Sequence, residues 1–231
     1  LVVIQLGAIL AVAVMYFQKL NPFSPSKSAR QKQATWALWI KIVIACIPAA
    51  VLGLLFDDWM EAHLYNAYVV AATLIIYGVL FIVLENSSIT ANPSITKVGH
   101  VSTKTALFIG LFQLLSLVPG TSRSGSTILG AMVLGCSRGV AAEFSFFLGI
   151  PVMFGASFLK LVKFFVKGNV LTGPQIFYTI LGMAIAFGVS VYSIQFLMGY
   201  VRRHDFKFFG YYRIILGVVV LAYFGITALA A

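Results

Sequence analysis

Charged residues and cysteines are scarce in this chain of 231 residues. Only 10% of its positions carry charge, 61% are hydrophobic, and two are cysteines. A soluble globular domain cannot hide that much apolar surface. The composition therefore excludes a soluble domain and favours a membrane protein. Cys46 and Cys136 both lie in apolar runs, where small core residues are expected rather than a disulfide or a metal site.

Acidic residues are scarcer still, with six Asp and Glu against sixteen Lys and Arg. In a membrane protein this excess is first a topology signal, because cytoplasmic loops carry the positive charge. It also suits the anionic head groups of a bilayer. A nucleic-acid partner is not expected, since the cations are scattered among helix ends and do not cluster on one face.

What the chain has in abundance is apolar segments of helical length. They cover residues 1–17, 36–56, 67–84, 141–165, 176–201 and 208–230. Polar connections are expected at 19–35 and 85–104, and an acidic one at 57–66. The sequence therefore predicts an all-α polytopic membrane protein whose residues 1–231 form a single transmembrane domain.

The segment 105–135 departs from this pattern. Residues 105–118 would form a helix too short to cross a hydrocarbon core of ~30 Å at ~1.5 Å per residue. A break at Pro119 and Gly120 follows, and then a second short apolar piece that ends at Gly135. These features predict a re-entrant helical hairpin, because irregular backbone at membrane depth must be buried in protein or line a polar cavity.

The loop charges give a provisional orientation. Loop 19–35 has four cations and is expected inside, which puts the acidic loop 57–66 outside. If 105–135 is re-entrant, the chain returns to the inside at Arg138, and Arg202 and Arg203 also lie inside. A full crossing would put the basic link 202–207 outside, so the charge count slightly favours the re-entrant interpretation.

The hairpin break predicts an anion site. It contains Gly120, Ser122, Arg123, Ser124, Ser126 and Thr127. An arginine at membrane depth is a functional-site hypothesis by default, and its planar fork matches phosphate geometry. The free amides and dipole at the start of the second short helix also favour an anion. Arg123 and Thr127 would share a helix face, and Ser122 could act as donor or nucleophile.

A structural interpretation of the same hydroxyls stays open. Ser and Thr side chains can satisfy backbone carbonyls at a helix break, with Gly120 and Gly125 supplying turn geometry. That interpretation does not account for Arg123, which is why the anion site is preferred.

Four other polar residues are candidates for supporting roles. Glu143 enters an apolar helix, so we expect it to pair with Arg138 or Arg123 or to help hold a cation. Arg138 follows the helix-capping Ser137 and is interpreted as a topology charge. Gln5 either bonds between helices or lines the site. Arg213, with Tyr212, is interpreted as an interfacial anchor.

The signature in the break resembles that of a known family. The run Pro119-Gly120-Thr121-Ser122-Arg123-Ser124-Gly125-Ser126-Thr127 is similar to the P-G-x-S-R-S-x-x-T signature of the undecaprenyl-pyrophosphate phosphatases, also called bacitracin-resistance proteins. Residues 3–12 resemble the family's first long helix, residues 137–138 and 142–146 the segment after the signature, and Tyr212-Arg213 its closing helix. The resemblance covers essentially the whole chain.

The resemblance implies a membrane hydrolase of the bacterial cytoplasmic (inner) membrane. The family is a phosphatase that converts undecaprenyl pyrophosphate to undecaprenyl phosphate plus phosphate, which recycles the lipid carrier for peptidoglycan synthesis, cell-wall biogenesis and cell shape and underlies antibiotic resistance to bacitracin. Carried over by position, the catalytic residues are Ser122, Arg123 and Thr127. The substrate-binding residues are Gly120, Ser124, Ser126 and Gln5, with Glu143 and Arg138 as possible supports.

The family fold is an inverted-topology repeat with two re-entrant hairpins. Transporters share this architecture, so the alternative is a lipid-pyrophosphate carrier or flippase that does not hydrolyse. A third class, the acid-phosphatase-like lipid phosphatases, is discounted because no His and Asp follow Ser137-Arg138 at the required spacing.

One family motif is missing from the sequence. The family has two Glu spaced by three residues and then a Ser-Ser-Thr-Gly-His run, which supply the carboxylates linked to Mg²⁺ or Ca²⁺. No two of the three Glu residues here show that spacing, and no Ser-Ser-Thr-Gly-His run occurs. We expect the first hairpin and the metal ligands to lie upstream of Leu1, and this polypeptide alone to be inactive.

Overall fold

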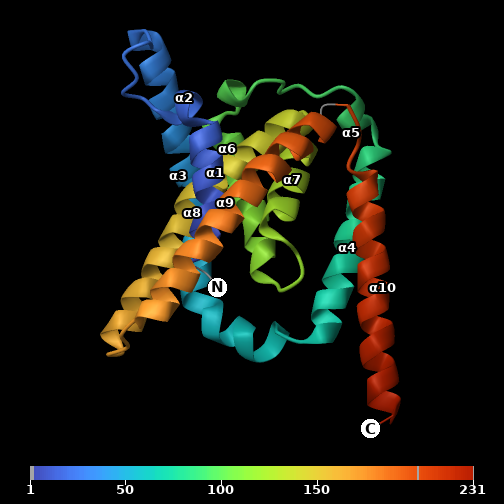
Figure 1. The fold of residues 1–231 in the computed structure, drawn as a ribbon. Coiled ribbons are helices and arrows are strands. Elements are labelled where there is room, and N and C mark those ends of the chain that lie inside the picture. Colours follow the sequence, from blue (N-terminus) through green and yellow to red (C-terminus); the bar gives the residue numbers. More distant parts are fainter. Residues whose placement is uncertain (1–2, 202, 231) are drawn as a thin grey trace. The chain divides into compact units, whose positions relative to one another are not determined.

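The chain is all-α. The computed structural model describes residues 3–201 and 203–230, and within these ranges the only β-type pairing is an isolated bridge between Ile95 and Cys136. Five helices are long and apolar enough to cross a membrane (Figure 1). They are α3 (Ala29–Leu64), α4 (Ala67–Glu85), α8 (Arg138–Val166), α9 (Gly173–Val201) and α10 (Lys207–Ala230). The predicted all-α polytopic class is confirmed.

Helix α3 is longer than the sequence suggested, because the acidic loop expected at 57–66 is mostly helical. The His63 ring stacks on Trp59 at 4.8 Å, and its Nδ1 lies 2.8 Å from the Trp59 carbonyl oxygen, which supports the last turns. The helix ends at Leu64, and Asn66 begins the next one by accepting a hydrogen bond from Val69 N at 3.0 Å. Arg202, which the charge count placed inside, lies outside the described residues.

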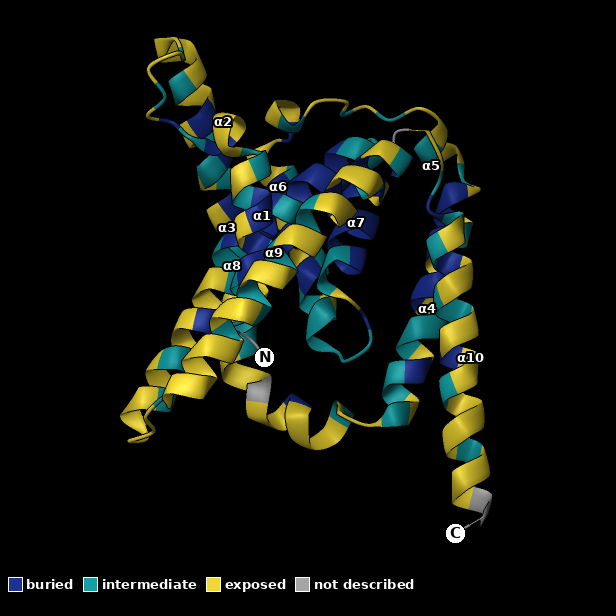
Figure 2. Ribbon diagram, viewed as in Figure 1, coloured by how far each residue is buried: buried dark blue, intermediate teal, exposed yellow. Residues whose placement is uncertain are grey.

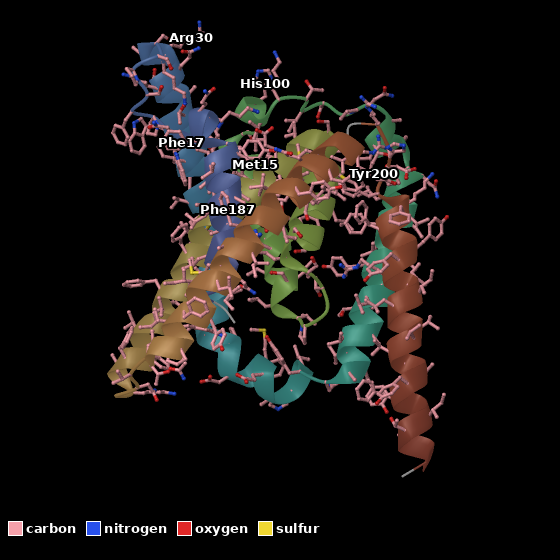
Figure 3. All side chains as sticks on the ribbon, viewed as in Figure 1. Met15, Phe17, Arg30, His100, Phe187 and Tyr200 are labelled. Atoms are coloured by element: carbon pink, nitrogen blue, oxygen red, sulfur yellow. The ribbon has the colours of Figure 1, made fainter. Side chains whose placement is uncertain are left out.

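The chain divides into two compact units, and the first comprises Leu1–Val43 and Phe146–Tyr200. Helix α1 (Gln5–Met15) packs on α9 so closely that a Cβ on Gly7 would lie 2.1 Å from the Met183 carbonyl oxygen. Trp39 Nε1 donates to the Leu20 carbonyl at 2.8 Å, which ties α3 to the short helix α2 (Phe17–Leu20). Figure 3 shows the Arg30 side chain pointing away from these helices.

The second unit comprises Ile44–Ser145 and Val201–Ala231. Within it α4 and α10 lie side by side and antiparallel (Figure 1). Glycines permit this close approach: a Cβ on Gly78 would lie 2.7 Å from the Gly210 carbonyl oxygen, and one on Gly217 would lie 2.9 Å from that of Ala71. The two helices therefore pack backbone to backbone, which leaves no room for one to slide past the other.

The predicted hairpin is also in this unit. Helix α6 (Thr103–Leu114) continues through the 3₁₀ turn η2 (Leu115–Leu117) to a loop, from which α7 (Arg123–Val133) runs back alongside α6. A Cβ on Gly130 would lie 2.3 Å from the Phe112 side chain, so the two short helices are in close contact. Figure 2 shows most of α7 as buried.

The two ends of the hairpin meet. Ile95 N donates to the Gly135 carbonyl at 2.9 Å, and Ser137 N donates to the Ile95 carbonyl at 2.9 Å. The connection from α4 to α6 also contains α5 (Ser88–Ala91) and η1 (Val98–His100). The chain therefore leaves the hairpin beside the point where it entered, as the re-entrant interpretation requires. The inverted repeat stays a prediction.

Candidate phosphate site at the hairpin tip

The loop between η2 and α7, residues 118–122, is the tip of the hairpin, and its backbone presses against α4. Thr73 Oγ1 donates to the Pro119 carbonyl at 2.8 Å. Gly120 has φ +86°, and a Cβ there would lie 2.2 Å from Thr73 Oγ1 and 2.7 Å from the Val70 carbonyl oxygen. Only glycine satisfies both the backbone conformation and the close approach, so Gly120 shapes the tip.

Ser122 holds a conformation that is rare for a residue with a side chain. Among the described non-glycine residues it alone has positive φ, at 66°. Such a backbone costs about 1–3 kcal/mol and recurs at functional sites. Its Oγ caps α7 by accepting a hydrogen bond from Gly125 N at 3.3 Å, and lies 3.4 Å from Ser124 Oγ. The residue is exposed, so its hydroxyl is accessible at the tip.

Arg123 is the first residue of α7, and a network of hydrogen bonds holds it in place. Its Nη1 donates to the Ser145 carbonyl at 3.2 Å, and its own carbonyl accepts from Thr127 Oγ1 at 3.0 Å. Thr127 Oγ1 also lies 2.7 Å from Ser145 Oγ. The network links α7 to the first turns of α8. Thr127 is fully buried, so in this structure it positions Arg123 from behind the tip.

The other signature hydroxyls divide into two groups. Ser126 is fully buried and its Oγ donates to the Arg123 carbonyl at 3.0 Å. Ser126 and Thr127 thus satisfy backbone at the helix start, as the structural interpretation anticipated. Ser122 and Ser124 lie nearer the surface of the tip. The substrate-binding roles of Ser124 and Ser126 stay predictions.

Arg213 of α10 is a functional candidate that the sequence interpretation missed. Its Nη2 donates to the carbonyls of Gly120 at 2.7 Å and Thr121 at 3.0 Å, and its guanidinium lies over the Tyr77 ring at 5.7 Å. The interfacial-anchor interpretation of Arg213 did not anticipate these bonds to the hairpin tip. A signal was present, because a cation two turns inside an apolar helix is as unusual as one in the break.

The remaining predicted residues lie elsewhere. Arg138 begins α8 and forms an ion pair with Glu85 at the end of α4, a partner that the sequence interpretation did not name. Glu143 is buried on α8, and Gln5 is an exposed residue at the start of α1 in the other unit. Figure 3 shows His100 on the connection into α6, at the opposite end of the hairpin from the tip.

The tip is rich in hydroxyls and guanidinium groups and poor in metal ligands. Within residues 3–201 and 203–230, no three His, Cys, Asp or Glu side chains come together as a cation site would require. The residues gathered at the tip do not fit a divalent metal, whereas hydroxyls, backbone amides and arginines suit an anion.

Fold and site together define a polytopic α-helical membrane protein with an arginine- and hydroxyl-bearing helical hairpin. The chain belongs to the bacitracin resistance protein BacA family, which it matches over residues 1–219. It is 58% identical over 222 residues to an undecaprenyl-diphosphatase of Streptococcus thermophilus, covering 96% of this chain and 77% of that protein.

Two further relatives agree. An undecaprenyl-diphosphatase of Lactobacillus delbrueckii is 58% identical over 95% of this chain and 80% of its own length. One of Enterococcus faecalis is 54% identical over 96% of this chain and 80% of its own length. With its five apolar helices, the chain is a multi-pass protein of the bacterial cytoplasmic membrane.

Proposed function

We propose that this chain hydrolyses undecaprenyl pyrophosphate to undecaprenyl phosphate plus phosphate, the activity for which its relatives are named. Such a membrane hydrolase recycles the lipid carrier of cell-wall synthesis, in keeping with the bacitracin-resistance family. The partners in this proposal are a polyprenyl pyrophosphate lipid and the bilayer, with no role for nucleic acid.

One observation carries the proposal to particular residues: Arg123 is held at the N-terminal end of α7 by Ser145 and Thr127. A helix N-terminus carries about half a positive charge, and a guanidinium fork adds a full charge and bidentate donors. Because both are fixed before the substrate arrives, they stabilise the developing negative charge without reorganisation. We assign Arg123 to the terminal phosphate.

The chemistry breaks the bond between the terminal phosphorus and the bridging oxygen, and undecaprenyl phosphate leaves with that oxygen. The attacking oxygen is either water or Ser122 Oγ. In the second case a phosphoserine forms and water then releases phosphate from it. The exposed position of Ser122 at the tip suits either attack or donation to a phosphate oxygen. Thr127 contributes through its bonds to Arg123 and Ser145.

A divalent cation, Mg²⁺ or Ca²⁺, belongs to the proposal through the family resemblance alone. The described residues at the tip do not fit one, so no step is assigned to it here. Phosphate release should fall when EDTA is added and return with excess Mg²⁺ or Ca²⁺. Full activity in EDTA would remove the cation from the proposal.

The deciding experiment measures phosphate release from a prenyl pyrophosphate in detergent. Two proteins are assayed first: residues 1–231 alone, and the same residues with the N-terminal segment of a relative added. The variants are then compared in whichever of the two is active. Arg123→Ala should lose nearly all activity. Arg30→Ala is the matched control, because Arg30 is an exposed arginine in the other unit. Activity of Arg123→Ala near the parent level contradicts the assignment.

The carrier alternative is tested on the same protein in vesicles. Movement of a labelled prenyl pyrophosphate across the bilayer without phosphate release would replace the phosphatase proposal. Phosphate release that Arg123→Ala abolishes would support hydrolysis.

A further inference from the structure

Glu85, the last residue of α4, has a completely buried carboxylate. Three hydrogen bonds from the Arg138 guanidinium reach it, two of them from Nε at 2.9 and 3.0 Å. Phe206 N donates to its Oε1 at 2.9 Å. A buried charge is tolerated only when it is paired and hydrogen-bonded, and this carboxylate meets both conditions.

These contacts, which we call the base clamp, join three helix ends. Glu85 ends α4, Arg138 begins α8, and Phe206 immediately precedes α10. The clamp also reaches the hairpin, because Arg138 follows Ser137, whose amide is bonded to Ile95 at the hairpin base. The base of the hairpin and the start of α10 are therefore fixed to one carboxylate.

The same helix pair holds the other end of the hairpin. From α4, Thr73 bonds the Pro119 carbonyl, and from α10, Arg213 bonds the carbonyl of Gly120. Arg213 lies on α10 seven residues after Phe206, which is about 10 Å along the helix axis at ~1.5 Å per residue. The height of Arg213 relative to the tip is thus set by where the clamp fixes Phe206.

Close packing transmits that position along the pair. A Cβ on Gly210 would lie 2.8 Å from the Gly78 carbonyl oxygen, and the rings of Phe81 and Phe206 lie 5.7 Å apart beside the clamp. Helices in backbone contact move as a unit rather than bending independently. A change at the clamp therefore reaches Arg213 as a shift of α4 and α10 together, relative to the hairpin.

We propose that Glu85 is a positioning residue that sets the register of Arg213 against the hairpin tip. The proposal rests on the phosphatase function, in which the tip holds the pyrophosphate. Glu85 touches no reacting atom in this account and acts through α10. The Arg138 side chain is 34% exposed, so water can solvate its charge when the ion pair is broken. The main effect of breaking the pair is therefore a change in the position of the helix, and not the cost of an unpaired buried charge.

The test is a double-mutant cycle on kcat/KM with Glu85→Gln and Arg213→Ala. Glutamine keeps an acceptor for Phe206 N and removes the charge that holds Arg138. We expect Glu85→Gln to lower kcat/KM about ten- to a hundredfold in the parent, since a displacement of about 1 Å is that costly. In Arg213→Ala, which is itself impaired, the same change should cost less than about twofold, because the residue it positions is gone.

Asp205→Asn is the matched control. Asp205 neighbours Phe206, and its carboxylate forms a partly exposed ion pair with Lys207 at 3.5 Å. We expect its kcat/KM to stay within about twofold of the parent, as for most exposed pairs. Equal losses from Glu85→Gln in both backgrounds would show a merely structural role and overturn the inference.

A second readout does not depend on activity. Spin labels at Leu107 on α6 and Tyr211 on α10, both exposed, report the distance between the hairpin and α10. Glu85→Gln should shift or broaden this distance, and an unchanged distribution overturns the inference. If Glu85→Gln does not fold, Arg138→Lys is used, since it keeps the charge and loses the fork. A parent that releases no phosphate even with the N-terminal segment of a relative added would contradict the proposed function, while the distance still tests the clamp.

Discussion

The Nη2 atom of Arg213 lies 2.7 Å from the carbonyl oxygen of Gly120, ninety-three positions earlier in the chain. This hydrogen bond brings a second guanidinium, from the last helix, to the loop that directly precedes Arg123. Two arginines beside one hairpin tip repel each other unless an anion or carbonyl oxygens neutralise them. The relationship therefore strengthens the assignment of the tip to an anionic head group.

Arg213→Lys should lower kcat/KM at least about tenfold, because an ammonium cannot reproduce a fork that bonds two neighbouring carbonyls and lies over Tyr77. Phosphate release from a short-chain prenyl pyrophosphate measures this. Lys207→Gln removes a cation from the same helix near its exposed start and serves as the control. A fully active Arg213→Lys would mean that charge alone matters at this position.

Two glycines of the signature should differ in their tolerance of alanine. At Gly120 an added Cβ meets Thr73 and the Val70 backbone, with φ at +86°, whereas at Gly125 the nearest atoms are 3.4 Å or more away. We expect Gly120→Ala to destabilise the protein by about 1–3 kcal/mol and to abolish activity. Gly125→Ala should fold normally. Thermal unfolding in detergent compares the two, and equal midpoints would contradict this geometry.

Thr127→Val removes a buried hydroxyl while keeping the side chain's shape. It leaves Ser145 Oγ without its 2.7 Å partner and releases the Arg123 carbonyl from one donor. Loss of a buried hydrogen-bond partner costs about 1–3 kcal/mol, so a lower unfolding temperature and reduced kcat are expected. Thr127→Ser restores the hydroxyl and should recover most activity; failure to recover would assign the role to the methyl group.

Two substitutions at Ser122 can separate the chemistry of its hydroxyl from the strain in its backbone. Glycine relieves the positive φ, while alanine keeps the strain, and both remove Oγ. We therefore expect Ser122→Gly to be more stable than Ser122→Ala by about 1 kcal/mol, yet both to lose activity. If Ser122 is the nucleophile, rapid quenching of the parent traps a phosphoserine that neither variant forms. High activity in both variants would show that Ser122 is not the nucleophile. Water would then be the attacking group, and Ser122 would serve only as the N-terminal cap of α7.

Much of the fold follows from local patterns that a single sequence displays. Apolar length located α4, α8, α9 and α10, and the short pieces around Pro119 located the hairpin, whose helices begin at Thr103 and end at Val133 against an expected 105–135. The link between Arg123 and Thr127 also follows from helical spacing. These features depend on near neighbours in sequence, which is why they were predictable.

What the sequence did not reveal depends on contacts between distant segments. Arg213 was interpreted as an anchor, because nothing local shows that α10 lies beside the tip. Arg138 was interpreted as a topology charge, because its partner Glu85 is fifty-three residues away. The extension of α3 past Phe56 was missed for a different reason: acidic residues suggested a loop, whereas stacking of His63 on Trp59 favours helix.

The backbone bonds of Ile95 to Gly135 and Ser137 have a consequence for how relatives of this chain can diverge. They hold the two sides of the hairpin base together, so the connection 96–102 contributes little to fixing the position of α4 relative to α8. Residues can be gained or lost there without displacing either flanking helix. Natural length variation should therefore concentrate in that short stretch and spare the span from Pro119 to Thr127.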